Sequence, residues 1–196
     1  MKRLGILGGT FNPIHTAHLI IAEAAREKLR LDKVLFIPSA NPPHKSSENL
    51  ADAQARLKMI NLAITGNEFF ESSDVEIKNL LSKSYTVDTI KILKDTLRDT
   101  GIFLLIGMDC LLELQTWKEP DKLFELSEVV VLNREGFSVI DAMNEFRDRV
   151  KYVTVPNLEI SSTEIRKKVK DGKSIKYLVP FHVEDYIRKN KMYIGN

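Results

Sequence analysis

Two glycines and two histidines lie close together in residues 8–18, whose sequence is GGTFNPIHTAH. Glycine has no Cβ, so a backbone that contains Gly8 and Gly9 can approach a ligand closely. His15 and His18 are three positions apart, a spacing that places both side chains on one face of a helical turn. Imidazoles donate hydrogen bonds to phosphate oxygens and add positive charge when they are protonated. A helix that begins just after His18 would add unpaired N–H groups, so the segment predicts a phosphate-binding loop.

The same histidines have two other interpretations. They could be structural, with one imidazole packed in the core and the other capping a helix, or they could be a pair of metal ligands. Catalytic zinc usually has three protein ligands, and the only further histidines are His44 and His182, so carboxylates would have to complete a metal site. The preceding glycines favour phosphate over both interpretations. The segment has neither a G-x-G-x-x-G spacing nor a Walker Gly-Lys-Ser/Thr, which disfavours a redox dinucleotide domain and a P-loop kinase.

Polar side chains also gather in residues 38–45 (PSANPPHK) and in residues 84–89 (SYTVDT). The double proline stiffens the first segment, which taken alone is typical of a surface loop. In the second segment, a serine or threonine hydroxyl would cap a helix by accepting a hydrogen bond from a first-turn N–H. The side chains concerned are Asn41, His44 and Lys45 in the first segment and Ser84 and Thr86 in the second.

Two later segments combine groups that suit a nucleotide. In residues 107–117, Asp109 follows an expected strand and can accept hydrogen bonds from ribose hydroxyls. Trp117, the single tryptophan, can stack on a planar ring; a lone tryptophan is more often a core residue, but its polar neighbours favour partial exposure. In residues 160–166 (ISSTEIR), hydroxyls at an expected helix start and Arg166 one turn later would either form a second anion cradle or simply cap the helix.

Short runs of Val, Ile and Leu alternate with helical patterns along nearly the whole chain. The runs are continuous, which is typical of parallel strands covered on both faces. This predicts a doubly wound, mostly parallel α/β sheet with helices on both faces, and ligands that bind beyond the carboxyl ends of the strands. We expect strands at residues 4–7, 34–37, 103–106, 129–132 and 152–155, and helices at residues 21–29, 53–64, 86–97, 165–169 and 179–187.

The composition is that of a globular protein, with 196 residues, 43% of them hydrophobic and 29% charged, which predicts one domain over residues 1–196. The net charge is only +2, and basic residues usually neighbour acidic ones, so we expect no nucleic-acid partner. A single cysteine allows no intrachain disulfide, which favours a reducing cytoplasm. The longest apolar run, residues 102–106, is too short to span a bilayer, and the N-terminus lacks a signal-peptide pattern. We therefore expect a complete, soluble, intracellular protein with no membrane partner.

The segment GGTFNPIHTAH resembles the H-x-x-H signature of the nucleotidyltransferase superfamily, whose members join a nucleotide to a phosphate ester and release pyrophosphate. The whole chain is similar to the bacterial nicotinate-nucleotide adenylyltransferases, with matching segments from residue 5 to about residue 166 in the family's order. The departures are small: Asn12 stands where Asp is frequent, Ala17 where Gly is usual, and Met108 where a small residue is common. The resemblance implies adenylyl transfer from ATP to nicotinate mononucleotide in NAD biosynthesis, in the cytoplasm, with Mg²⁺ delivered by ATP.

The resemblance also implies which residues form the site. His15 and His18 would be the catalytic pair, which holds phosphoryl oxygens as charge redistributes in the transition state. No metal site made by protein side chains is expected. The nicotinate mononucleotide site would comprise Asn41, His44, Lys45, Thr86 and Trp117. The ATP site, completed by the helices from about residue 161, would comprise Gly8, Gly9, Thr10, Phe11, His15, His18, Gly107, Asp109, Ser161, Ser162, Thr163 and Arg166.

Two other functions remain open from the sequence. A transferase with the same H-x-x-H loop could act on phosphopantetheine or on nicotinamide mononucleotide, although residues 42–45, Thr86 and Trp117 favour nicotinate. A nucleotide-sensing module would bind ATP without releasing pyrophosphate, which the two phosphate cradles disfavour. Residues 191–194 either dock on the chain or mediate self-association into a homo-oligomer.

Overall fold

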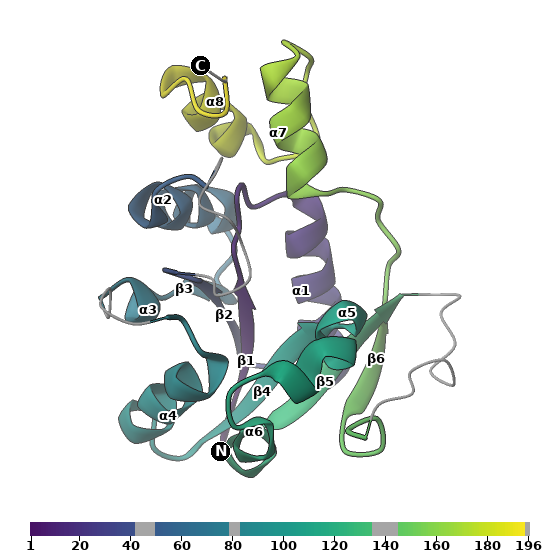
Figure 1. Cartoon of the computed structure of the whole chain (residues 1–196). Coiled ribbons are helices and arrows are strands. Elements are labelled where there is room, and N and C mark those ends of the chain that lie inside the picture. Colours follow the sequence, from purple (N-terminus) through teal and green to yellow (C-terminus); the bar gives the residue numbers. More distant parts are fainter. Residues whose placement is uncertain (42–49, 79–82, 135–144, 195–196) are drawn as a thin grey trace.

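The computed structural model describes residues 1–41, 50–78, 83–134 and 145–194, and its sheet lies between two layers of helices (Figure 1). Six strands pair in the order β3-β2-β1-β4-β5-β6, and every pair is parallel. The predicted doubly wound α/β sheet is therefore confirmed. The strands are β1 (Lys2–Gly9), β2 (Lys33–Pro38), β3 (Phe70–Ser72), β4 (Thr100–Gly107), β5 (Glu128–Arg134) and β6 (Lys151–Val155).

The sheet is apolar on both faces, which explains the continuous hydrophobic runs. Successive residues of a strand point to opposite faces. In β4, Leu105 belongs to the core cluster on one face, whereas its neighbours Leu104 and Ile106 belong to the cluster on the other. The first face is covered by α1 (Thr16–Leu29) and α2 (Ala53–Ile64), and the second by α4 (Thr86–Thr96), α5 (Met108–Glu113), the 3₁₀ helix η1 (Leu114–Thr116) and α6 (Pro120–Leu126).

The two last helices, α7 (Ser162–Lys170) and α8 (Phe181–Lys189), lie beyond the end of β1, at the top of Figure 1. Their buried residues Ile165, Val183 and Ile187 join the same core cluster as α1 and α2. Burying each such side chain contributes about 1.5–3 kcal/mol. The closing helices are thus packed on the sheet domain, and α7 meets the loop that follows β1.

The strand order has a switch point between β1 and β4. The chain passes from β1 to β2 in one direction along the sheet, and β4 then returns to the other side of β1. In open parallel sheets, the connections leave this point in opposite directions and open a crevice at the carboxyl ends of the two strands. The loops after β1 and β4 therefore face one another across the position where a ligand is expected.

All five expected strands are present, but the sixth was missed. β3 has only three residues and pairs with β2 at the sheet edge, so it is too short to form an apolar pattern. Residues 108–126, for which no helix was predicted, form α5, η1 and α6, and a short helix α3 (Val75–Lys78) was also missed. α1 begins at Thr16, within the glycine–histidine segment and not after it. Among the described residues, no helix is long and apolar enough to cross a membrane.

Candidate active site

The loop after β1 uses its two glycines differently. A Cβ at Gly8 would meet no atom within 4 Å, so this exposed position leaves open space at the end of the strand. A Cβ at Gly9 would press on the Phe11 ring at 3.1–3.3 Å. Phe11 has a φ of 46° and is only 3% exposed, so its side chain belongs to the core. Gly8 therefore provides the access expected for a ligand, whereas Gly9 makes room for the ring that anchors the loop.

The structure brings the two predicted histidines together. His15 is the N-cap of α1, and His18 lies in its first turn. Their rings are stacked, with centroids 3.6 Å apart and an interplanar angle of 22°. The Phe11 ring meets His18 edge-on at 5.1 Å. The backbone N–H of His15 donates to His18 Nδ1 at 3.2 Å, so a neutral His18 carries its proton on Nε2 and can donate from there.

Burial determines the protonation state of His15. It is only 5% exposed, and burial lowers the pKa of its imidazole to about 4. His15 is therefore neutral near pH 7 and does not add the positive charge that a protonated imidazole would supply. Its Nδ1 is buried and has no hydrogen-bond partner among the described residues. The backbone N–H of His18 is nevertheless directed at the His15 side chain, as one half of a capping box at the start of α1.

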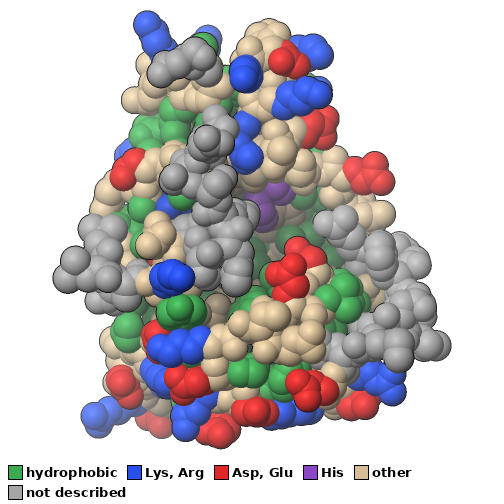
Figure 2. Space-filling model, in the orientation of Figure 1, with side chains coloured by type: hydrophobic (Ala, Val, Ile, Leu, Met, Phe, Trp, Pro, Cys, Tyr) green, Lys and Arg blue, Asp and Glu red, His purple; other side chains and the backbone are tan. Residues whose placement is uncertain are grey.

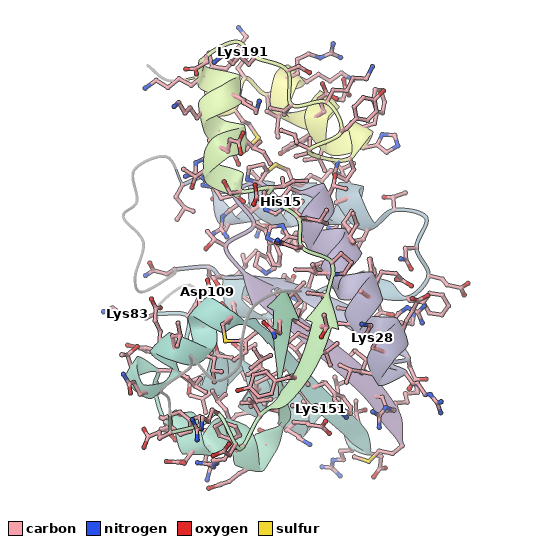
Figure 3. All side chains as sticks on the ribbon, turned by 90° about the vertical axis from the view of Figure 1, so that its right-hand side faces the viewer. His15, Lys28, Lys83, Asp109, Lys151 and Lys191 are labelled. Atoms are coloured by element: carbon pink, nitrogen blue, oxygen red, sulfur yellow. The ribbon has the colours of Figure 1, made fainter. Side chains whose placement is uncertain are left out.

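A cavity of about 390 Å³ lies at the predicted switch point. It is bounded by the ends of β1 and β4 and by the start of α4. Figure 2 shows histidine side chains in a depression on the face turned toward the viewer, and Figure 3 places His15 between the C-terminal helices and the sheet. The predicted residues that line the cavity are Gly8, Gly9, Thr10, Thr86, Gly107, Asp109 and Trp117.

The segment after β4 contributes a carboxylate and an indole to this cavity. A Cβ at Gly107 would collide with the Asp109 carboxylate in its present position, so a larger residue there would make that side chain turn away. Asp109 is exposed and projects from α5, a helix that the sequence did not predict (Figure 3). Trp117 is half-buried against the core cluster of the second face. Its predicted partial exposure is confirmed, and it shares the cavity with Thr86.

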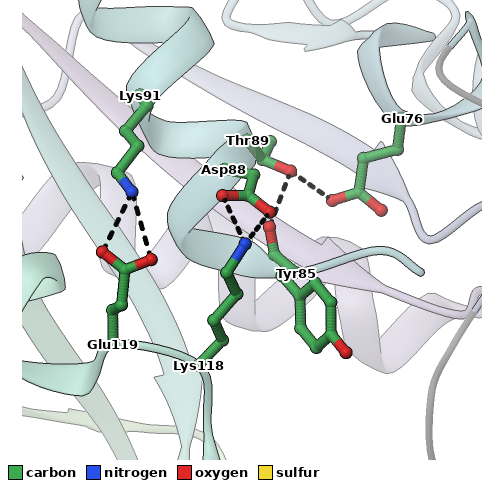
Figure 4. A network of polar contacts seen from close by, with 7 residues as sticks. All are labelled: Glu76, Tyr85, Asp88, Thr89, Lys91, Lys118 and Glu119. Atoms are coloured by element: carbon green, nitrogen blue, oxygen red, sulfur yellow. Dashed lines mark hydrogen bonds and ion pairs between the residues drawn. The ribbon is translucent and has the colours of Figure 1, made fainter. Parts of the chain in front are cut away.

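Two ion pairs join the Trp117 segment to α4 (Figure 4). Lys118 Nζ donates to both carboxylate oxygens of Asp88, at 2.8 and 3.1 Å, and Lys91 Nζ lies 3.1 Å from Glu119 Oε2. The hydrogen bond to Asp88 is the main reason why the pKa of Lys118 is raised. These contacts place Trp117 next to the first turn of α4, which carries Thr86.

Capping of α4 differs from the prediction. Its N-cap is Tyr85, which makes no side-chain capping hydrogen bond. The Ser84 hydroxyl accepts a hydrogen bond from the Asn41 N–H at 3.1 Å instead, and the Ser84 N–H donates to the Asn41 carbonyl at 3.2 Å. The first-turn N–H groups of α4 are therefore not capped by Ser84, and Thr86 faces the cavity. His44 and Lys45 lie outside the described residues.

The expected second phosphate cradle begins α7 and contacts the first loop. Ser161 is the N-cap and accepts from the Glu164 N–H at 3.1 Å, which confirms the predicted cap. The Ser162 hydroxyl donates to the Pro13 carbonyl at 2.8 Å. Arg166 donates to the Asn12 carbonyl at 2.9 Å and to Thr163 Oγ1 at 3.3 Å. The two predicted cradles therefore meet, although these side chains do not line the 390 Å³ cavity.

Two polar residues, the half-buried Glu76 and the fully buried Arg56, were missed from the sequence. Glu76 lines the cavity; its Oε1 accepts from the Thr89 hydroxyl at 2.7 Å, and its Oε2 is buried without a hydrogen-bond partner in the described part of the chain. Arg56 is fully buried beneath the loop after β1. A signal for Arg56 was present, because it falls three residues after Ala53 and four before Ile60, on the apolar side of the expected helix.

Comparisons with known proteins agree with this architecture. A family model described as cytidylyltransferase-like matches residues 6–168. A probable nicotinate-nucleotide adenylyltransferase of Thermoanaerobacter is 44% identical, with 97% of this chain and 94% of the relative covered. One from Clostridium novyi is 40% identical, with 98% and 100% covered. The solved nicotinic acid mononucleotide adenylyltransferase of Plasmodium falciparum, complexed with NaAD, has a TM-score of 0.80 at 22% identity and covers 100% and 99% of the two chains.

Proposed function

Because this chain belongs to the cytidylyltransferase-like family, we propose that it transfers the adenylyl group of ATP to nicotinate mononucleotide, a step of NAD biosynthesis. The products are nicotinate adenine dinucleotide and pyrophosphate. The observation that carries the proposal is the cavity at the switch point, which is lined by the open position at Gly8, the Asp109 carboxylate, Thr86 and the Trp117 indole. The two stacked imidazoles follow the same glycine loop, at the start of α1, and do not line this cavity.

The transfer needs no protein nucleophile. A phosphate oxygen of nicotinate mononucleotide attacks the α-phosphorus of ATP, a new O–P bond forms, and the bond to the bridging oxygen breaks. Pyrophosphate leaves with that electron pair. Chemistry of this kind is accelerated by positioning and by donors aimed at the phosphoryl oxygens. His18 Nε2 is such a donor, because its Nδ1 already accepts from the His15 N–H.

The two phosphate cradles have separate tasks in this proposal. The loop after β1 holds the α-phosphate beside the open position at Gly8. The start of α7, held against the loop by Ser162 and Arg166, receives the β- and γ-phosphates. Unpaired N–H groups and the positive end of the helix dipole favour the departing pyrophosphate there. The α-phosphate and the departing pyrophosphate are thereby held by two segments that are hydrogen-bonded to each other.

The acceptor occupies the other end of the cavity. Its pyridine ring stacks on Trp117, and its carboxylate lies at the N-terminus of α4 beside Thr86, where the helix dipole favours an anion. Asp109 accepts hydrogen bonds from ribose hydroxyls. The phosphate of the mononucleotide contacts Asn41, His44 and Lys45 in this proposal.

The donor set fits Mg²⁺ that is bound mainly by the substrate. Mg²⁺ prefers oxygen ligands and usually keeps several waters beside substrate phosphates. The described ranges contain no group of three His, Cys, Asp or Glu side chains that could hold a metal ion by themselves. Carboxylates do line the cavity, and Asp109 is the one nearest in sequence to the end of β4. When bound, Mg²⁺ supplies charge neutralisation on the triphosphate.

The test is to incubate the pure protein with Mg-ATP and, separately, nicotinate mononucleotide, nicotinamide mononucleotide and phosphopantetheine. Product mass and pyrophosphate release are measured. We expect nicotinate adenine dinucleotide and one pyrophosphate per product. Preferred reaction of another acceptor would replace the proposed substrate, and ATP binding without pyrophosphate release from any acceptor would indicate a sensing module.

The catalytic pair is tested by His18→Ala. Loss of one charge-stabilising donor typically lowers kcat by about 10²–10³-fold, and we expect a loss of that size with ATP still bound. His182→Ala is the matched control, because His182 is an exposed histidine on α8 and is not part of the stacked pair. Near-wild-type turnover of His18→Ala would contradict the assigned role.

A further inference from the structure

Asn12 lies at the centre of a polar cluster behind the loop after β1. It is only 6% exposed. Its Oδ1 accepts two hydrogen bonds, from the Ala51 N–H at 3.1 Å and from the Tyr193 hydroxyl at 2.8 Å. Its carbonyl accepts from Arg166 at 2.9 Å. One residue of the phosphate loop is therefore bonded to the segment before α2, to α7 and to the end of the chain.

Tyr193 reaches this cluster from the C-terminal tail. It packs with Met192 against the core cluster of the first face. Its φ is 63°, a left-handed conformation that residues other than glycine rarely adopt, so the tail is held in place by its contacts. Burial raises the pKa of its hydroxyl well above the usual range, and the group stays a protonated donor throughout the physiological pH range.

Arg56 fixes the backbone of the same loop through hydrogen bonds from its buried guanidinium. Its side chain is fully buried, and its guanidinium donates to the Thr10 carbonyl at 2.8 Å, the Ala51 carbonyl at 2.9 Å and the Ala40 carbonyl at 3.4 Å. Three separate nitrogens of the planar guanidinium serve these three carbonyls, a fixed and spread geometry that the compact ammonium of lysine does not reproduce. The backbone on both sides of Asn12 is thus fixed by bonds that leave the cavity face of the loop open.

We propose that Tyr193, Asn12 and Arg56 are positioning residues, which hold the backbone of residues 10–12 in the geometry needed for adenylyl transfer without touching substrate. This inference rests on the proposed function. It gives the last residues of the chain a task in the reaction, because the hydroxyl of Tyr193 fixes the side chain that orders the loop. Misplacement of a catalytic loop lowers turnover more than it lowers ground-state binding.

The first test is Tyr193→Phe, which removes one hydroxyl and keeps the buried ring. We expect kcat to fall about three- to tenfold, the effect of one buried hydrogen bond, with the KM for ATP changed less than twofold. Lys191→Ala, an exposed change in the same tail, is the control. Unchanged kcat in folded Tyr193→Phe, or an equal loss in Lys191→Ala, would overturn the role of Tyr193.

A second set of variants asks whether Tyr193 acts through Asn12. Asn12→Ala removes the shared acceptor, and Asn12→Asp keeps it, so we expect Asn12→Asp to recover most of the turnover that Asn12→Ala loses. Tyr193→Phe should cause little further loss in the Asn12→Ala background, because coupled residues are not additive. Additive losses would refute the pathway through Asn12. Arg56→Lys should lower kcat at least as much as Tyr193→Phe.

Amide hydrogen exchange separates this inference from the proposed activity. The Ala51 N–H is bonded to Asn12 Oδ1, so its exchange should accelerate about tenfold in Asn12→Ala and remain slow in Asn12→Asp. This readout needs no turnover. If wild-type protein releases no pyrophosphate, the proposed function fails while the exchange still reports the cluster. If wild type is active but exchange and kcat are unchanged in the variants, the positioning role fails.

Discussion

His15 is a buried neutral base, and its burial couples folding to pH. The unfolded imidazole takes up a proton below about pH 6.5, whereas the folded one does so only near pH 4. Between these values the unfolded state binds more protons, so the stabilising contribution is present above pH 6.5 and is lost as the pH falls toward 4.

We therefore expect His15→Gln to flatten the dependence of stability on pH. The wild type should lose about 1–2 kcal/mol more unfolding free energy than the variant between pH 6.5 and pH 5, given about 1.4 kcal/mol per unit of pKa difference. Urea unfolding at both pH values measures this. Parallel profiles would mean that His15 is charged in the folded protein.

Trp117 offers a direct optical test of the acceptor site, because it is the single tryptophan of the chain. Nicotinate mononucleotide should quench its fluorescence, and ATP should not. Base–aromatic stacking contributes about 1–3 kcal/mol, so Trp117→Ala should raise the KM for the mononucleotide roughly tenfold and leave the KM for ATP unchanged. Trp117→Phe should retain most of the affinity. Quenching by ATP alone would place the indole at the donor nucleotide instead.

Among the elements, α4 and the segment after η1 act as a pair that is joined at the surface. Both joining ion pairs are exposed, and such pairs contribute about 0–1 kcal/mol each. Lys118→Ala should therefore raise the KM for nicotinate mononucleotide only about two- to fivefold, with kcat and the KM for ATP unchanged. Lys122→Ala is the matched control, because Lys122 pairs with Glu125 within α6. High salt should reproduce the effect by screening.

The length and burial of each element decide whether its hydrophobic pattern can be recognised in the sequence. The long apolar runs of β1, β2, β4, β5 and β6 predicted strands because burial on both faces leaves a strong pattern. β3 and α5 are short, and their few buried residues form no period that can be recognised. The start of α1 was misplaced because its N-cap is a histidine, an unusual capping residue.

The site was predictable where chemistry shows in residue type, and not where it depends on contacts across the chain. Glycines, histidines and the ISST hydroxyls pointed to the two segments that the structure brings together. The roles of Asn12 and Arg56 depend on partners 39 and 46 residues away, which no local pattern contains. The neutral state of His15 likewise follows from packing, because burial lowers its pKa.

For the whole molecule, nucleotide binding should raise thermal stability. A ligand at one hundred times its Kd contributes about 2.7 kcal/mol, and for a chain of this size each kcal/mol shifts Tm by about 2–4 °C. A non-hydrolysable ATP analogue should therefore raise Tm by about 5–10 °C. The shift should shrink in Ser162→Ala, whose bond to Pro13 joins α7 to the first loop. The absence of any shift at saturating analogue would contradict the donor site.

The loop after β1 is bonded to Ser162, Arg166 and Tyr193, which follow it by 149, 154 and 181 residues. Because synthesis runs from the N-terminus to the C-terminus, these three residues are made long after the loop that they contact. A nascent chain that has completed its sheet still lacks these three contacts, so the loop should reach its final arrangement only after Tyr193 has left the exit tunnel. A chain that ends before Tyr193 would lack the last of them.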